Sequence, residues 1–346
     1  MEKIAYLAMD VHARSCTLGQ MDANGCFKGN LRFATSERNI IGALKSVKAK
    51  NKLLTMEEGT LTHWIAQVAS PYVSEVIACD PRENALIFKS PNKKDQVDTR
   101  SLCRLLRLGE LKHVYHTCKN DRAIFKASAQ HYLDFRDQLT RLKHKIKAAY
   151  RRWGVIDVFS TSVYNSSGRK KYLKQIKQLS IRSQLNRLYL LMDQTEALRK
   201  SALHSMEQLG LKYPEIREFE KIPGIATVNA HVFDAFVQTP HRFAKRNQLW
   251  KYCRLSVTQR SSDGKQLGYK RLDTSGVSEL KALSFRAFMA AMRGDNEVKA
   301  FYLYSLKRTH NRTHARLNTQ RKILTVMLGI WKKGQAYRPE LFSGSV

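Results

Sequence analysis

The chain has 346 residues, and its 61 Lys and Arg against 29 Asp and Glu give a formal net charge of +32. Ordinary solubility needs a net charge of only ~2–8, so this excess favours a polyanionic partner, DNA or RNA, over a merely soluble basic protein. No apolar run reaches the ~20 residues that a bilayer span needs, and the N-terminus lacks a signal-peptide pattern. We therefore expect a cytoplasmic protein with no membrane contact.

The first third of the sequence predicts an α/β domain. Its apolar runs and turn signals predict, in chain order, a strand at 4–9, a hairpin over 15–21 and 28–33, a helix at about 36–48, a strand at 53–56, a helix at about 61–69, a strand at 75–79 and a helix that begins near 96. A β-meander followed by alternating helices and strands predicts a mixed sheet with helices on its faces. This is also the order of elements in the ribonuclease-H-like fold.

The middle of the chain has a helical pattern. From about 120 to 211, apolar residues recur at helical spacing with little Pro or Gly, and a polar loop interrupts them at 160–171. This predicts two long helices in an antiparallel coiled coil. Residues 136–152 hold seven Lys or Arg and one acid. Charged residues in a helix usually form a face exposed to solvent. Because nearly all of these are positive, they favour a surface that binds the phosphates of a nucleic acid.

Pro214 marks a boundary, and a mostly helical domain is predicted after it. The turn Ile222-Pro223-Gly224-Ile225 opens a helix, and its free backbone N–H groups suit either a phosphate contact or a plain helix entry. The sequence thus predicts three domains. They are an α/β domain at 1–118, a helical segment for dimerisation and nucleic-acid binding at 119–212, and a helical domain at 213–346.

Four acids stand at positions typical of a metal site. Asp10 and Glu57 each follow a predicted strand, at the edge where open α/β sheets bind ligands. Asp95 and Asp98 are three residues apart at the start of a helix, so they share one face. Each acid alone suits a structural role, such as a helix N-terminus. Together they suit Mg²⁺, which would also reconcile an anionic cluster with a protein that attracts polyanions.

These residues carry a resemblance to the DEDD transposases of bacterial insertion sequences, whose relatives include the pilin-gene invertases. In the first half the resemblance rests on Asp10 after its strand, on the turn at 56–59, and on the block at 94–99. In the second half it rests, in order, on 222–225, Arg242-Phe243, 260–264, Gly276, Leu280-Lys281, 321–324 and 331–334. It covers nearly the whole chain.

The resemblance implies a fold and an activity. The fold is α/β plus all-α: a ribonuclease-H-like, resolvase-like mixed-sheet domain, a coiled coil and a small helical transposase domain. The last supplies a serine that attacks DNA, while Asp10, a glutamate, Asp95 and Asp98 hold Mg²⁺ beside it. The resemblance also implies a structured bridge RNA that guides the enzyme on target and donor DNA. It implies dimers that pair into tetramers.

Two motifs depart from the pattern of that family. The glutamate motif is usually Glu-Ala-Thr-Gly, whereas both Glu57 and Glu58 precede Gly59 here. Strand alternation lets only one of them serve, and Glu57 directly follows the apolar run. The serine motif usually has Ser-Gly, whereas Ser261 and Ser262 here precede Asp-Gly, and register favours Ser262. On its residues alone, this segment also suits an ordinary turn.

Three functions therefore compete. The first is an RNA-guided DNA recombinase, or transposase, with a serine nucleophile. The second is a metal-dependent junction nuclease that hydrolyses DNA without the serine. The third is a non-catalytic RNA- or DNA-binding protein whose acids are structural. The resemblance favours the first.

Overall fold

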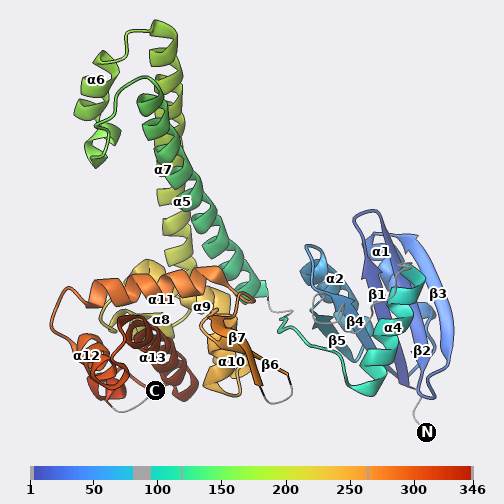
Figure 1. The fold of residues 1–346 in the computed structure, drawn as a ribbon. Helices are drawn as coiled ribbons and strands as arrows, with labels where there is room; N and C mark the ends of the chain where they lie inside the picture. The colour runs from blue at the N-terminus through green and yellow to red at the C-terminus, as the bar shows by residue number, and fades with distance from the viewer. Residues whose placement is uncertain (1–3, 81–94, 118–119, 263–264, 344–346) are drawn as a thin grey trace. The chain divides into compact units, whose positions relative to one another are not determined.

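The computed structural model describes residues 4–80, 95–117, 120–262 and 265–343, and of residues 95–98 and 259–269 the backbone only (Figure 1). The chain divides into two compact units, Met1–Ala123 and Ile124–Val346. The finer division into 1–118, 119–212 and 213–346 stays a prediction.

A five-stranded sheet in the order β3-β2-β1-β4-β5 forms the centre of the first unit. Its strands are β1 (Ile4–Val11), β2 (Ser15–Asp22), β3 (Phe27–Ala34), β4 (Asn51–Glu57) and β5 (Glu75–Cys79). The β1–β2 and β2–β3 pairs are antiparallel, whereas the β1–β4 and β4–β5 pairs are parallel. The predicted mixed α/β sheet is confirmed.

Helices cover both faces of this sheet (Figure 1). On one face, α1 (Glu37–Ser46) and α2 (Thr62–Ala69) bury Leu7 and Met9 of β1 together with Leu54 and Met56 of β4. On the other face lies α4 (Asp95–Leu108), and its contacts are with Tyr6, Ala8, Met21, Leu53, Ile77 and Cys79. Because side chains alternate along a strand, odd positions of β1 face α1 and α2, and even positions face α4.

The second unit contains a long helical hairpin. The helices α5 (Asn120–Arg152) and α7 (Leu179–Gly210) lie side by side, with the short helix α6 (Ser166–Lys174) at the far end (Figure 1). Between them, the buried Tyr189 hydroxyl donates to the Val163 carbonyl at 2.9 Å and lies 3.0 Å from the Tyr150 hydroxyl. The two predicted long helices are confirmed, and a coiled coil in the strict sense stays a prediction.

The rest of the second unit is mostly helical, as predicted. Its helices are α8 (Glu215–Glu220), α9 (Thr227–Val237), α10 (Arg246–Tyr252), α11 (Ser278–Ala291), α12 (Glu297–Thr309) and α13 (Arg312–Lys333). Gly224, in the predicted turn before α9, has φ +88°, and a Cβ there would lie 2.1 Å from the Ala287 carbonyl oxygen. The turn therefore has a packing role against α11, which accounts for its glycine.

A two-stranded hairpin was not predicted in this region. It consists of β6 (Val257–Ser262) and β7 (Lys265–Leu272), paired antiparallel. Ser261 and Ser262 lie at the end of β6, and Ser262 pairs with Lys265 of β7; the turn and the nucleophile interpretations of this segment both stay predictions. The Asp-Gly dipeptide that follows them is a strong hairpin signal when strands flank it.

Candidate functional site

Asp10 and Glu57 occupy neighbouring positions on two adjacent strands. The parallel register pairs Met9 of β1 with Met56 of β4, so Asp10 and Glu57 are the next positions along their strands. Met9 and Met56 are buried against α1 and α2. Strand alternation therefore assigns Asp10 and Glu57 to the opposite face, which α4 covers.

Glu58 continues the chain beyond β4. By the same alternation it takes the face opposite to that of Glu57. Its backbone N–H donates to the Cys79 carbonyl at 2.9 Å. The Thr62 hydroxyl accepts from the Gly59 N–H at 2.7 Å and donates to the Glu57 carbonyl at 3.1 Å, so it orders the whole turn.

A cavity of about 500 Å³ opens at the carboxyl ends of β1 and β4. Asp10, Glu57 and Glu58 all line it, together with Trp64 of α2 and Leu102 of α4. Both glutamates line the cavity, and strand alternation favours Glu57 for the face that holds Asp10. Its volume falls within the ~300–1,000 Å³ that small-molecule sites usually have.

The helix α4 carries the second pair of acids. Asp95 and Asp98 lie in its first two turns, and their side chains are outside the described residues. In an α-helix, position 98 is one turn before position 102 and on the same face. Leu102 lines the cavity, so the start of α4 runs along the face of the sheet that holds Asp10 and Glu57.

A close contact with β2 determines how near the start of α4 comes to the sheet. The Thr99 hydroxyl donates to the Asn30 side-chain oxygen at 2.8 Å. A Cβ on Gly19 would lie 2.9 Å from the Thr99 Cβ, closer than real Cβ atoms approach one another. Glycine at position 19 thus allows α4 to pack directly on the backbone of β2.

His12 is a residue of this site that the sequence interpretation missed. Its Nε2 lies 3.2 Å from the Asp10 Oδ2, and its side chain is exposed. The sequence signal was that His12 comes two residues after Asp10. In an extended segment this spacing places both side chains on the same side. Thr62 was missed as well, because a hydroxyl five residues from Glu57 has no motif of its own.

Among the described residues, no group of three or more His, Cys, Asp and Glu is arranged to hold a metal ion. Asp10 and Glu57 are the described members of the predicted four-acid set. A carboxylate pair on one sheet face, open to a cavity, matches the hard oxygen ligands that Mg²⁺ prefers. These two carboxylates are of the ligand type that Mg²⁺ binds, and magnesium at this place stays a prediction.

The predicted serines belong to the second unit. Ser261 pairs with Gln266 and Ser262 with Lys265 in the β6–β7 hairpin. Their side chains lie outside the described residues. The carboxylates and the serines are therefore on different units of the chain.

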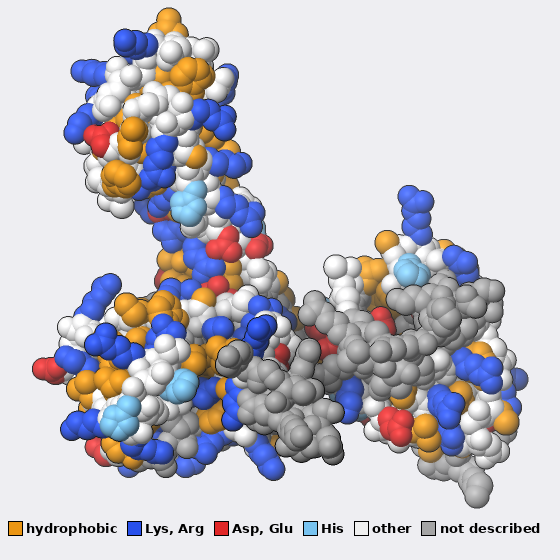
Figure 2. Space-filling model, viewed as in Figure 1, with side chains coloured by type: hydrophobic (Ala, Val, Ile, Leu, Met, Phe, Trp, Pro, Cys, Tyr) orange, Lys and Arg blue, Asp and Glu red, His pale blue; other side chains and the backbone are white. Residues whose placement is uncertain are grey.

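Exposed basic side chains follow the helical hairpin α5–α7 (Figure 2). They include Arg141, Lys145, Arg151, Arg152, Lys170, Lys171, Lys174, Lys177, Arg187 and Lys200. Aromatic rings lie among the basic groups: Lys143 and Lys147 each lie 5.5 Å from the Tyr164 ring centre. Basic groups combined with rings are the usual components of a nucleic-acid interface.

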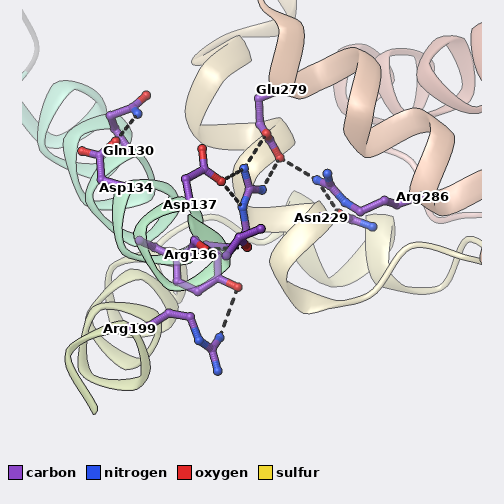
Figure 3. A network of polar contacts seen from close by, with 10 residues as sticks. Gln130, Asp134, Arg136, Asp137, Arg199, Asn229, Glu279 and Arg286 are labelled. Carbon is purple, nitrogen blue, oxygen red and sulfur yellow. Dashed lines mark hydrogen bonds and ion pairs between the residues drawn. The ribbon is translucent and has the colours of Figure 1, made fainter. Parts of the chain in front are cut away.

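A network of ion pairs holds the base of this hairpin to α11 (Figure 3). Arg136 of α5 donates two hydrogen bonds to Glu279, at 2.7 and 3.0 Å, and Arg286 donates a third at 2.6 Å. Burial alone would raise the pKa of Glu279, but the hydrogen bonds from the two guanidinium groups outweigh it and lower that pKa. The basic hairpin is therefore attached to the helices that follow it in the chain.

Two comparisons with known proteins bear on function. One of them found nothing: no curated protein matches the chain. The structure itself adds that no helix in the described parts of the chain is long and apolar enough to cross a bilayer. Residues 216–303 match the model of the Transposase IS116/IS110/IS902 family, over roughly a quarter of the chain. The matched span includes the β6–β7 hairpin with Ser261 and Ser262. The match supports transposase activity on DNA, and this part of the chain is similar to the transposases of the IS116/IS110/IS902 family.

Proposed function

We propose that this protein is an insertion-sequence transposase that cleaves and rejoins DNA strands through a serine nucleophile. Ser262 is the proposed nucleophile, with Ser261 as the second candidate. Asp10, Glu57, Asp95 and Asp98 are the proposed ligands of Mg²⁺. The observation that carries the proposal is the family match over 216–303, which spans the serine hairpin.

The arrangement of the first unit supports the carboxylate part of the proposal. We infer that its fold is ribonuclease-H-like, because the order β3-β2-β1-β4-β5, with three antiparallel-linked strands followed by two parallel ones, is the order of that fold. Asp10 and Glu57 share the α4 face, and α4 begins with Asp95 and Asp98. When bound there, Mg²⁺ would polarise a phosphate and stabilise its developing negative charge.

The chemistry of the serine follows from its hydroxyl group. Ser262 loses its proton and its Oγ attacks phosphorus; the bond from phosphorus to the DNA leaving oxygen breaks, and that oxygen gains a proton. The phosphoserine link keeps the energy of the broken bond, so a new DNA end can reverse the step and join without hydrolysis. Thr62 holds the turn that carries Glu57 and so orients one of the proposed carboxylate ligands.

The proposed partners are target DNA, donor DNA and a structured guide RNA. The net charge of +32 and the basic hairpin α5–α7 support polyanion binding. The resemblance to guided transposases supports the RNA, and sequencing of the RNA that copurifies with the protein from cells carrying its native flanking DNA tests it. Dimers that pair into tetramers are the proposed assembly, which the resemblance and the long helical hairpin α5–α7 support.

Substitution of the two serines tests the mechanism. The variants Ser262→Ala and Ser261→Ala serve as matched controls for each other, because they differ by one strand position. We expect Ser262→Ala to abolish both strand exchange and the covalent protein–DNA adduct that survives denaturation, whereas Ser261→Ala keeps them. Cutting that survives both changes would support the nuclease. Activity unaffected by Asp95→Asn and Asp98→Asn would support a non-catalytic binder.

A further inference from the structure

The C-terminal helices enclose a hollow that the proposed chemistry does not use. It measures about 260 Å³ and lies between α10, α12 and α13. Its walls include Trp250, Tyr304, Arg308, Asn318 and Arg321. All of these except Trp250 lie beyond the span that matches the transposase family. We call it the aromatic–arginine pocket.

Guanidinium groups lie over two of the three aromatic rings that line the pocket, those of Tyr304 and Trp250. Arg308 is 5.7 Å from the centre of the Tyr304 ring. Arg321 and Arg246 lie 5.4 and 5.5 Å from the Trp250 ring centre. Tyr304 is 47% exposed, so its ring is open to a ligand. Rings and arginines together provide stacking surfaces and positive charge at one place.

Hydrogen bonds hold the inner wall of the pocket in place. Arg321 donates from Nε and Nη2 to the Leu255 carbonyl at 2.9 and 2.6 Å, and the Trp250 Nε1–H donates to the Thr325 hydroxyl at 3.1 Å. Asn318 donates to the Ser305 hydroxyl at 3.1 Å. Amide and hydroxyl groups are the ones that pair with base edges. The site is thus ordered before a ligand arrives, which lowers the entropic cost of binding.

The composition and size of the pocket limit the kind of ligand that it can bind. None of the described residues that line it is acidic, so its chemistry suits an anion rather than a metal ion. Its volume is below the ~300 Å³ that starts the range for drug-sized ligands, which suits one planar base. Tyr304 also lines a second hollow of about 330 Å³. The acid Glu297 lines that second hollow, so a negatively charged ligand is assigned to the aromatic–arginine pocket alone.

We propose that the aromatic–arginine pocket binds one base of a single-stranded nucleic acid, with the base stacked on Tyr304 and a flanking phosphate held by Arg308. The choice of nucleic acid as the ligand rests on the proposed function; the position and chemistry of the site do not. The pocket takes an unpaired base because a base inside a duplex has both faces covered by its neighbours.

Photo-crosslinking of the full-length protein tests the site. The probes are RNA and DNA oligonucleotides of about six nucleotides that carry 5-iodouracil, a length within the range of known single-strand sites. Salt of about 0.3 M screens non-specific phosphate contacts, and EDTA keeps the assay independent of the carboxylate chemistry. We expect crosslinks, mapped by mass spectrometry, on Tyr304 or Trp250. Reaction with RNA alone, DNA alone or both identifies the source of the strand.

Binding measurements on variants give the second readout. Tyr304→Leu should weaken binding of the oligonucleotide by roughly tenfold, the scale of one lost stacking contact. Phe285→Leu is the matched control, because Arg316 lies 5.5 Å from the exposed Phe285 ring, which lines neither hollow. Arg308→Gln should also weaken binding, and Lys307→Gln, its neighbour on α12, should not.

Three results would overturn the proposal. The first is crosslinks confined to other parts of the chain. The second is equal affinity of the Tyr304→Leu variant and the unchanged protein for the oligonucleotide. The third is equal affinity of the unchanged protein for the oligonucleotide and for an abasic strand, which would leave only a phosphate site. Crosslinking of the unchanged protein decides the matter even if a variant fails to fold. These assays do not measure strand exchange, so their outcome does not depend on whether the proposed serine mechanism is correct.

Discussion

Glu57 and Glu58 differ by one position, and in a strand one position decides which face of the sheet a side chain takes. Glu57 follows Met56, which is buried against α1 and α2, so it shares the α4 face with Asp10. Glu58 takes the other face, although it too lines the cavity. At the scale of single residues, register therefore favours Glu57 as the metal ligand.

Glu57→Gln should reduce strand exchange by at least ~100-fold, the scale on which the loss of one group that stabilises transition-state charge acts. Glu58→Gln, its matched control, should stay within a few-fold of the unchanged protein. Recombination of a donor and a target plasmid, counted by sequencing the junctions, measures both. The reverse order of the two variants would assign the site to Glu58.

Glu279 is a second residue whose surroundings allow a prediction. Its side chain is 15% exposed and accepts hydrogen bonds from two arginines. Glu279→Gln should lower the stability of the folded chain by about 2 kcal/mol, since hydrogen bonds to charged groups contribute ~1.5–3 kcal/mol. Asp137→Asn, which removes a 54% exposed partner of the same Arg136, should cost less than ~1 kcal/mol. Chemical denaturation measures both.

The effect of Glu279→Gln should depend on pH. Because the pKa of Glu279 is lowered in the folded chain, its contribution to stability is complete above the pKa of the unfolded chain, roughly 4. That contribution is lost as the pH falls through the lower, folded pKa. The difference in unfolding free energy between the two proteins should therefore be largest near neutral pH and shrink below about pH 4. A constant difference across this range would contradict the ion pair.

At the scale of elements, the approach of α4 to β2 shapes the candidate metal site. Thr99 sits over Gly19, where a Cβ would lie 2.9 Å from the Thr99 Cβ. A side chain at position 19 would push away the start of the helix, which carries Asp95 and Asp98. The small residue on β2 thus sets the distance between two halves of the proposed ligand set.

Gly19→Ala should destabilise the chain by about 1–3 kcal/mol, the usual cost of overpacking. It should also reduce strand exchange, because the start of α4 moves. Gly42→Ala is the control: position 42 is exposed on α1 and has no atom within 4 Å of an added Cβ, so it should stabilise by ~0.5–1 kcal/mol. Thermal unfolding and hydrogen exchange of α4 peptides measure the change. Unaltered exchange in α4 would count against this packing.

At the scale of the whole molecule, the net charge of +32 should control binding to DNA and RNA. Each phosphate neutralised by Lys or Arg releases counterions. We therefore expect affinity to fall by roughly 10³-fold or more between ~50 and ~200 mM salt, as for proteins with six or more phosphate contacts. Fluorescence anisotropy with a labelled duplex and a labelled RNA measures the slope. A nearly flat dependence would exclude the basic surface as the binding site.

Local sequence was enough to predict the strands that end near Asp10 and Glu57, the helix that begins after Ser36, and the two long helices of the second unit. These features repeat over a few residues, so their periodicity is visible in one stretch of chain. The net charge and its preference for a polyanion also follow from composition alone. The four acids and the serines were named from position and resemblance, and they stay predictions.

The tertiary structure decided what depends on residues far apart in the chain. The α4 face of Glu57 follows from the pairing of β1 with β4, and the ion pair of Arg136 with Glu279 joins positions 143 residues apart. The aromatic–arginine pocket likewise draws Trp250, Tyr304 and Arg321 from three helices. No local pattern encodes such contacts, because strand pairing and helix packing select them only when the whole chain has folded.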